Sequence, residues 1–293
     1  MFLSLPVEVR SLILEQALIA QHEPPASPSK ENRVVYQDID YRAWKHRAYS
    51  QDRSTHRPPN CLALLLTCHQ ISAETKAILS LRKAHLHEYH LDISVLNEEE
   101  VYPTWTCVPQ LTTHVVTLNA DIRLFGHILS TASTRYQTHN GRFAFEWPLY
   151  AILERFLQYG AVGDKQQDIR MQDENTGMRQ LRSRYRKTDF IDRGITVDML
   201  ILDVSSAETQ YPLPPREVDF EDWDAWHDNG GIGKLDRYAS RPEWIARYLK
   251  EYIDMLLKPD TAFTEFGSIM HDRIGSIVIV IDGEVQYEFE LNP

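Results

Sequence analysis

Apolar residues recur at helical spacing in two segments near the beginning of the chain. The first begins around Pro6 and Glu8. Both suit a first helical turn, because proline lacks an N–H group that this turn leaves unpaired and glutamate favours the positive end of the helix dipole. Its apolar face is predicted by Val9, Leu12, Ile13, Ala17 and Ala20, widened by Leu14 and Leu18. A second helix with one buried side is predicted by Leu64, Cys68, Ile71, Thr75 and Ile78. Two short amphipathic helices hide both faces most simply by pairing.

The rest of the chain alternates between strand patterns and helix patterns. Apolar residues at every second position, or in short runs, predict strands within residues 84–96, 114–124, 195–204 and 277–281. The third run is apolar at nearly every position, which predicts a central strand covered on both faces. Asp282-Gly283 predicts a two-residue turn of the mirror-image type, and residues 284–291 then alternate between polar and apolar side chains. The chain therefore ends in a predicted β-hairpin.

Two further helices follow from their spacing and end signals. Pro148 begins a helix that Gly160 ends. Residues 240–243, Ser-Arg-Pro-Glu, have the sequence of a capping box, and the helix after them runs up to Pro259. Its buried stripe is predicted to be Ile245, Tyr248, Leu249, Tyr252 and Leu256. These elements predict an α+β fold in which an N-terminal helical pair packs on a mixed β-sheet with interspersed helices and a C-terminal β-hairpin.

Two regions make up this predicted fold. Residues 1–83 form a helical region interrupted by an insertion at residues 21–60, which is rich in proline, aromatic and basic residues. Residues 84–293 form a mixed α/β domain. We expect the two regions to fold as one compact unit.

Two motifs in the helical region resemble those of the F-box-like proteins abundant in filamentous fungi. The first is Leu5-Pro6-x-Glu8-Val9-Arg10, and the second, at residues 64–74, is Leu-Leu-x-Thr-Cys-x-Gln-Ile-x-x-Glu. Residues 89–93, 114–124 and 195–204 look like later strands of that family, so the resemblance covers most of the chain. It implies a protein-interaction module in which the helices bind a Skp-type adaptor of a cullin ubiquitin ligase and the sheet recruits a target. Carried over by position, the adaptor contacts are Leu5, Pro6, Glu8, Val9 and Ile13.

Composition narrows the class of protein. The chain of 293 residues is 43% hydrophobic and 25% charged, which is typical of a soluble globular protein. Its net charge of -11 disfavours nucleic acid as a partner. Three cysteines are too few for a disulfide framework, and we find neither a signal peptide nor an apolar run long enough to cross a membrane. The expected location is the cytoplasm or nucleus.

A second hypothesis is an enzyme of small-molecule metabolism, of transferase or cyclase type, built on the same scaffold. Its substrate pocket would lie between the sheet and two irregular segments, residues 21–60 and 205–240, because long insertions in compact domains often serve as binding loops. Aromatic and acidic residues at the rim of that pocket would be Trp44, Asp222, Trp223 and Trp226. The alternative is that both segments are solvated loops whose aromatic residues pack back on the domain.

Candidate catalytic residues come from two places. His87, Glu88 and His90 lie in the densest cluster of possible ligands, but successive residues of a strand point to opposite faces, so the cluster cannot hold one ion. We predict no metal and no cofactor. Asp198 and Asp203 lie in the predicted central strand, and acids near the carboxyl end of such strands are often functional. The alternatives are ordinary histidines at a sheet edge and acids that cap a loop.

Overall fold

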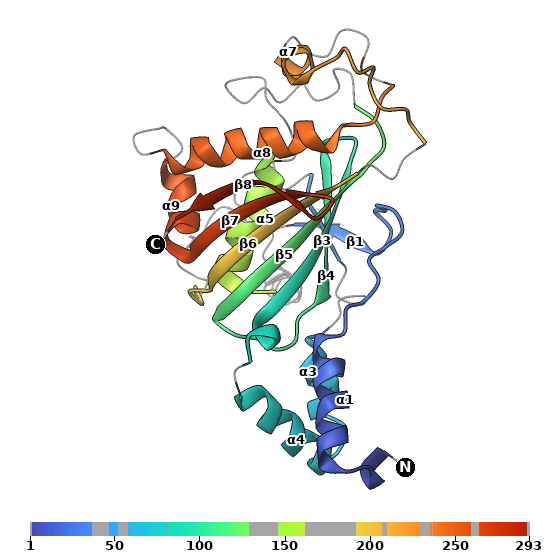
Figure 1. The fold of residues 1–293 in the computed structure, drawn as a ribbon, viewed down its shortest axis with the longest axis vertical. Helices are drawn as coiled ribbons and strands as arrows, with labels where there is room; N and C mark the ends of the chain where they lie inside the picture. Colours follow the sequence, from blue (N-terminus) through green and yellow to red (C-terminus); the bar gives the residue numbers. More distant parts are fainter. Residues whose placement is uncertain are drawn as a thin grey trace, which may run out of the picture.

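The computed structural model describes residues 2–36, 47–51, 58–81, 83–128, 146–161, 192–206, 210–228, 235, 237–258 and 264–291. Its centre is a six-stranded mixed sheet in the order β4-β3-β5-β6-β7-β8 (Figure 1). The strands are β3 (Glu88–Leu96), β4 (Glu100–Cys107), β5 (His114–Phe125), β6 (Thr196–Ser205), β7 (Ile274–Ile281) and β8 (Glu284–Glu290). The four inner strands are parallel, and β4 and β8 pair antiparallel at the two edges. The predicted α+β fold with its C-terminal hairpin is confirmed.

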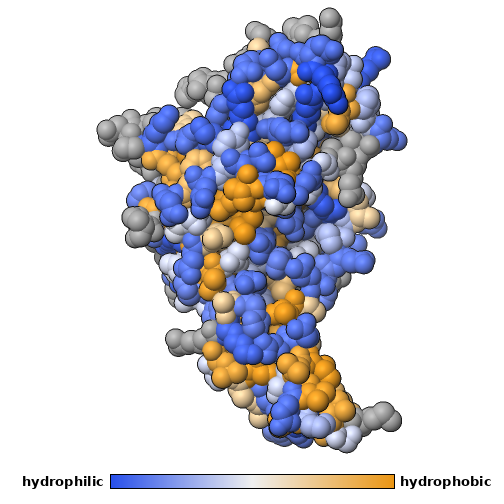
Figure 2. Space-filling view, in the orientation of Figure 1, coloured by the Kyte–Doolittle hydropathy of each residue, from blue (hydrophilic) through white to orange (hydrophobic). Residues whose placement is uncertain are grey.

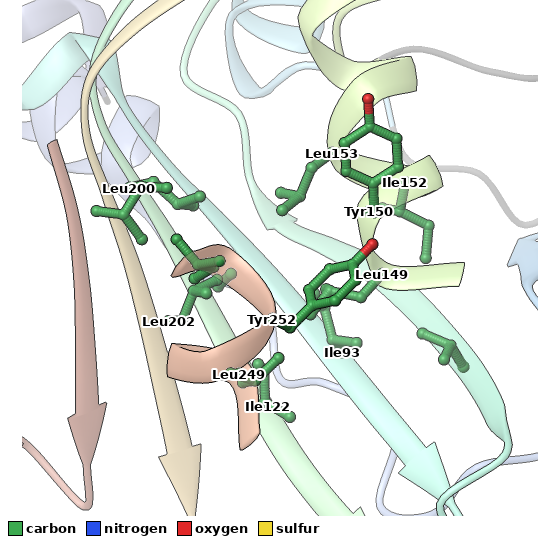
Figure 3. Close-up of a cluster of buried hydrophobic side chains, with 14 of the residues drawn as sticks. Ile93, Ile122, Leu149, Tyr150, Ile152, Leu153, Leu200, Leu202, Leu249 and Tyr252 are labelled. Carbon is green, nitrogen blue, oxygen red and sulfur yellow. The ribbon is translucent and has the colours of Figure 1, made fainter. Parts of the chain in front are cut away.

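Helices cover one face of this sheet. They are α5 (Glu146–Tyr159), α8 (Pro242–Leu257) and α9 (Thr264–Arg273). Figure 3 shows Leu149 of α5 and Leu249 of α8 pointing onto a layer of strand residues that includes Ile93, Ile122 and Leu202. All five residues of the predicted stripe of α8 are buried, as its regular spacing indicated.

The opposite face of the sheet has no helix over it among the described residues. Leu200, Leu202 and Val204 of β6 are buried under the helices, whereas Met199 on the other side is exposed and Ile201 is only half-buried. The prediction that this strand is central is confirmed, but the prediction that both its faces are covered is wrong. Apolar residues at nearly every position reflect one covered face and one face that remains partly apolar.

The described part of the predicted insertion at residues 21–60 wraps around the β4 edge. It contains a two-stranded ribbon, β1 (Arg33–Val35) and β2 (Tyr49–Gln51). On one side the Arg33 guanidinium donates to the Pro103 carbonyl at 2.9 Å and to Thr104 Oγ1 at 2.7 Å. The backbone N–H of Val101 donates to the Arg47 carbonyl at 2.6 Å, so the chain itself covers this edge of the sheet.

The N-terminal helices form a module that projects from one end of the sheet (Figure 1). They are α1 (Val7–Ile19), α3 (Asn60–Leu65) and α4 (His69–Ser80). We call them the helical module. It has its own small core, separate from that of the sheet, made of Leu14, Leu18, Cys61, Ile78 and Leu86. The second helix predicted from the sequence is in fact two helices, because the chain breaks at residues 66–68, where Thr67 Oγ1 donates to the Leu64 carbonyl at 2.7 Å.

Several elements differ from the sequence-based prediction. Residues 205–240 contain a helix, α7 (Phe220–Asp228), and residues 84–87 form a 3-10 turn before β3. The capping box is wrong: Ser240 lies before the N-cap residue Arg241, and its hydroxyl donates to the buried Glu98 carboxylate in the turn between β3 and β4. Strand β4 and helix α9 were not predicted at all.

Asn60 joins the helical module to the sheet. Its side-chain amide donates to the carbonyls of Leu18 and Ala20 at 2.7 and 2.9 Å, at the end of α1. Its backbone N–H donates to the Val108 carbonyl, just after β4, at 2.8 Å. One residue therefore fixes the end of α1 against the β4 edge.

We predict that Asn60→Asp loosens this junction, because a carboxylate would face two carbonyl oxygens with no hydrogen to donate. The expected loss of stability is about 1–3 kcal/mol, with faster hydrogen exchange in the last turn of α1. Thermal unfolding and exchange followed by mass spectrometry measure both. Gln16→Glu, the same chemical change at an exposed position of α1, should have little effect, and equal effects of the two variants would contradict the role given to Asn60.

Candidate functional site

Helix α1 is apolar on two sides, and only one side is covered. Arg10, Leu14 and Leu18, spaced four residues apart, face α3 and α4 and are buried. On the other side lies an exposed apolar face made of Val9, Leu12 and Ile13, with exposed fractions of 41%, 65% and 44%. The prediction that pairing of the helices hides the apolar face of this helix is therefore wrong for these three residues, whereas Leu14 and Leu18 are buried. Periodicity could not decide between the faces, because both are apolar.

Further exposed apolar residues belong to the same module. Figure 2 shows hydrophobic residues gathered over it at the bottom of the molecule. The large exposed ones outside the α1 face are Leu3, Val7, Leu62, Leu66 and Leu81. Single exposed apolar residues are ordinary on a protein surface, whereas a group of them on one small module is typical of an interaction surface.

A partly buried ion pair lies on the covered side of α1 and joins it to α4. Arg10 Nη2 lies 2.5 Å from Glu74 Oε1 on α4, and Arg10 Nε lies 3.1 Å from Glu74 Oε2. The hydrogen bond from Arg10 holds the pKa of Glu74 below its ordinary value, and the same bond raises the pKa of Arg10. Arg10 also donates to the Leu5 carbonyl, which fixes the turn that precedes the helix.

Four of the five predicted adaptor contacts are therefore accessible. Pro6, Glu8, Val9 and Ile13 are exposed, and Leu5 is half-buried. Leu12, the most exposed apolar residue of α1, was not among the predicted contacts, although its spacing from Val9 was a signal that could have included it.

Three aspartates lie side by side on the face of the sheet opposite the helices. Asp92 of β3 is in register with Asp121 of β5, which is in register with Asp203 of β6. Asp92 is buried, and Arg123 donates to both its carboxylate oxygens, at 3.0 Å to Oδ2. Ser94 also donates to Asp92, at 3.2 Å. Desolvation nevertheless raises the pKa of Asp92, because it outweighs the contribution of Arg123.

Asp121 occupies the middle of this row. Its burial, with the neighbouring charges of Asp203 and Asp92, raises its pKa to about 6. Arg123 acts in the opposite direction but is already held by Asp92. Asp203 accepts a hydrogen bond from the Gly283 N–H at 3.4 Å. Among these three acids only Asp203 was a sequence candidate, because strand register is invisible in a single sequence.

The predicted catalytic residues do not come together. His87 Nδ1 lies 3.1 Å from the His114 carbonyl, and Glu88, beside it, is half-buried at the beginning of β3. Asp198 Oδ2 lies 3.4 Å from His114 Nε2, whereas Asp203 lies toward the opposite end of β6.

His90 lies 3.1 Å from Gln21 Nε2, and burial lowers its pKa. Within the described residues, no group of three or more histidine, cysteine or acidic side chains could hold a metal ion. The residues proposed for the enzyme hypothesis are thus divided between separate parts of the sheet.

The predicted ligand rim divides in the same way. Trp223 is fully buried against Phe220, Trp244 and Tyr248, so its side chain belongs to the core and not to a rim. Asp222 is exposed in the first turn of α7, and its backbone N–H donates to Asp219 Oδ1 at 2.9 Å.

Two rim candidates lie outside the described structure. Trp44 is outside the described residues, and Trp226 lies in α7 with its side chain outside them.

Comparison with protein-family models, curated proteins and solved structures gives no match to this chain. In the part of the chain that the structure describes, none of the helices combines the length and the apolar character needed to cross a bilayer.

We predict that Asp121→Asn changes how stability depends on pH. The folded protein holds a proton on Asp121 up to about pH 6, whereas an unfolded aspartate releases it near pH ~3.9. Wild-type stability should therefore fall as the pH rises between these values, and the loss then persists at neutral pH. The variant avoids this loss and should be more stable at neutral pH by up to about 2 kcal/mol, with no gain below pH ~4.

Urea unfolding at a series of pH values measures this difference. Asp272→Asn, at an exposed position, is the control and should not reproduce the gain. A gain that is the same at all pH values would contradict the proposed ionisation of Asp121.

Proposed function

We propose that the helical module binds a Skp-type adaptor protein and that the chain acts as an F-box-like interaction module. The observation that carries this proposal is the exposed apolar face of α1, Val9, Leu12 and Ile13. An apolar stripe along a helix is normally covered by another part of the protein or by a partner. Here one side is covered by α3 and α4, and a partner would cover the other.

The motif residues support the choice of this partner. Pro6, Glu8, Val9 and Ile13 are accessible at the positions where the resemblance implies adaptor contacts. Arg10 and Glu74, which also belong to the two motifs, form the ion pair on the covered side of α1. An adaptor that binds such a face would offer an apolar groove for a helix, read through residues three and four positions apart.

The arrangement of the two units also supports a recruiting role. The helical module projects from one end of the sheet, so a partner on α1 and a target on the sheet would occupy different parts of the molecule (Figure 1). The backbone N–H groups of Asn60 and Cys61 donate to the carbonyls of Val108 and Pro109, just after β4, so an adaptor on α1 and a target on the sheet would keep a defined separation.

We predict that Leu12→Asp or Ile13→Asp weakens adaptor binding by at least about tenfold, because burying a leucine or isoleucine side chain contributes about 1.5–3 kcal/mol. Stability should change little, since both side chains are exposed in the free protein. Co-purification with a Skp-type adaptor and titration calorimetry measure binding, and thermal unfolding measures stability.

Leu213→Asp is the matched control. Leu213 is 56% exposed and lies outside the helical module. If Leu12→Asp binds the adaptor as tightly as the control does, or if the wild-type protein does not bind at all, the proposal fails.

A further inference from the structure

The two edges of the sheet differ in what pairs with them. The β4 edge is covered by the chain's own residues, including the Arg47 carbonyl, which accepts from Val101, and the His22 N–H, which donates to Thr106 at 2.9 Å. At the other edge, β8 pairs only with β7, and no other strand of the described residues lies beyond it. An unpaired edge offers backbone donors and acceptors to an added strand.

The hydrogen-bond register identifies the outward backbone groups of β8. The Leu291 N–H donates to the Gly275 carbonyl at 2.8 Å, which makes these two residues a hydrogen-bonded pair. Such pairs alternate along an antiparallel ladder, so Phe289 and Tyr287 also bond to β7. The backbone groups of Glu288 and Glu290 therefore point away from the sheet.

The side chains of the same two residues add charge to this edge. Glu288 and Glu290 are exposed, and they lie on the face opposite the helices, because they are in register with Val278 and Ser276. Strands β5 to β8 contain one basic residue of the lysine or arginine type, Arg123, which Asp92 already binds. The acids of these four strands are Asp121, Asp198, Asp203, Glu284, Glu288 and Glu290.

Apolar side chains lie next to the glutamates of β8. Val285 is exposed, and Tyr287 and Phe289 are only partly buried where they pack against the core. A strand added here would meet carboxylates and Val285, which is in register with Val280, on one face, and the rings of Tyr287 and Phe289 on the other, since side chains alternate between the two faces.

We propose that the outer edge of β8 binds an extended basic segment of a partner protein as a seventh strand of the sheet. The segment that fits carries lysine or arginine at every second position, opposite Glu288 and Glu290, and apolar residues between them. A second copy of this chain does not fit, because pairing β8 with β8 would bring glutamates together across the new contact. This surface lies apart from the α1 face and does not depend on the proposed adaptor binding.

The test uses the full chain and a fluorescent synthetic peptide in which lysine and valine alternate. Fluorescence anisotropy should show binding that weakens as salt is added. Glu288→Lys with Glu290→Lys should weaken it by about tenfold or more, because two attractive contacts become repulsive. Glu31→Lys with Glu217→Lys, two exposed positions elsewhere, gives the same net charge and should change binding much less.

A second peptide separates strand pairing from simple charge attraction. It has the same sequence, with alternate backbone nitrogens methylated, so it keeps its charge but cannot complete the ladder. We expect it to bind at least about tenfold more weakly than the unmodified peptide, because it cannot form all the backbone hydrogen bonds to β8.

Equal binding of the two peptides, equal effects of the two double variants, or self-association of the wild-type chain through β8 would each overturn the proposal. Leu12→Asp should leave peptide binding unchanged, so failure here and failure of adaptor binding remain distinguishable.

Discussion

The architecture depends on one constraint: a mixed sheet has two faces to cover, and the described residues supply helices for only one of them. The apolar layer of Ile93, Ile122 and Leu202 lies under α5 and α8 and contains most of the buried core. On the other face, residues 21–36 cover the region near β4, where Arg123 also donates to the Pro25 carbonyl at 2.8 Å. Beyond that point the face is partly open, and it mixes polar residues with apolar ones such as Met199 and Ile201.

This division explains the row of aspartates. An acid in the middle of a strand is unfavourable under a helix, because desolvation opposes its charge. Asp92, Asp121 and Asp203 lie on the face that no helix of the described residues covers, and the most buried of them, Asp92, is the one that an arginine binds. The row is therefore a consequence of one-sided coverage, and it shapes the charge of the whole open face.

Sequence patterns predicted the elements whose periodicity has a single interpretation. The stripe of α8 has apolar residues on one side only, and Asp282-Gly283 adopts the left-handed backbone of the predicted turn, with φ angles of 47° and 86°. Helix α1 has apolar residues on both sides, so its spacing predicted a helix but not its buried face. The pairing of Asp92 with Asp121 depends on strand register, and the buried state of Trp223 depends on α7 packing against α8. Both are long-range contacts that local patterns do not contain.

The bond between Ser240 and Glu98 joins groups that lie 142 residues apart in the chain. Glu98 is in the turn after β3 and has a left-handed backbone, with φ of 57°. This conformation is energetically unfavourable for residues other than glycine. During synthesis on the ribosome, β3 and β4 emerge long before the serine that binds this glutamate. The turn therefore lacks this bond until most of the protein has been translated, and we expect the last stage of folding to begin only when α8 reaches the sheet.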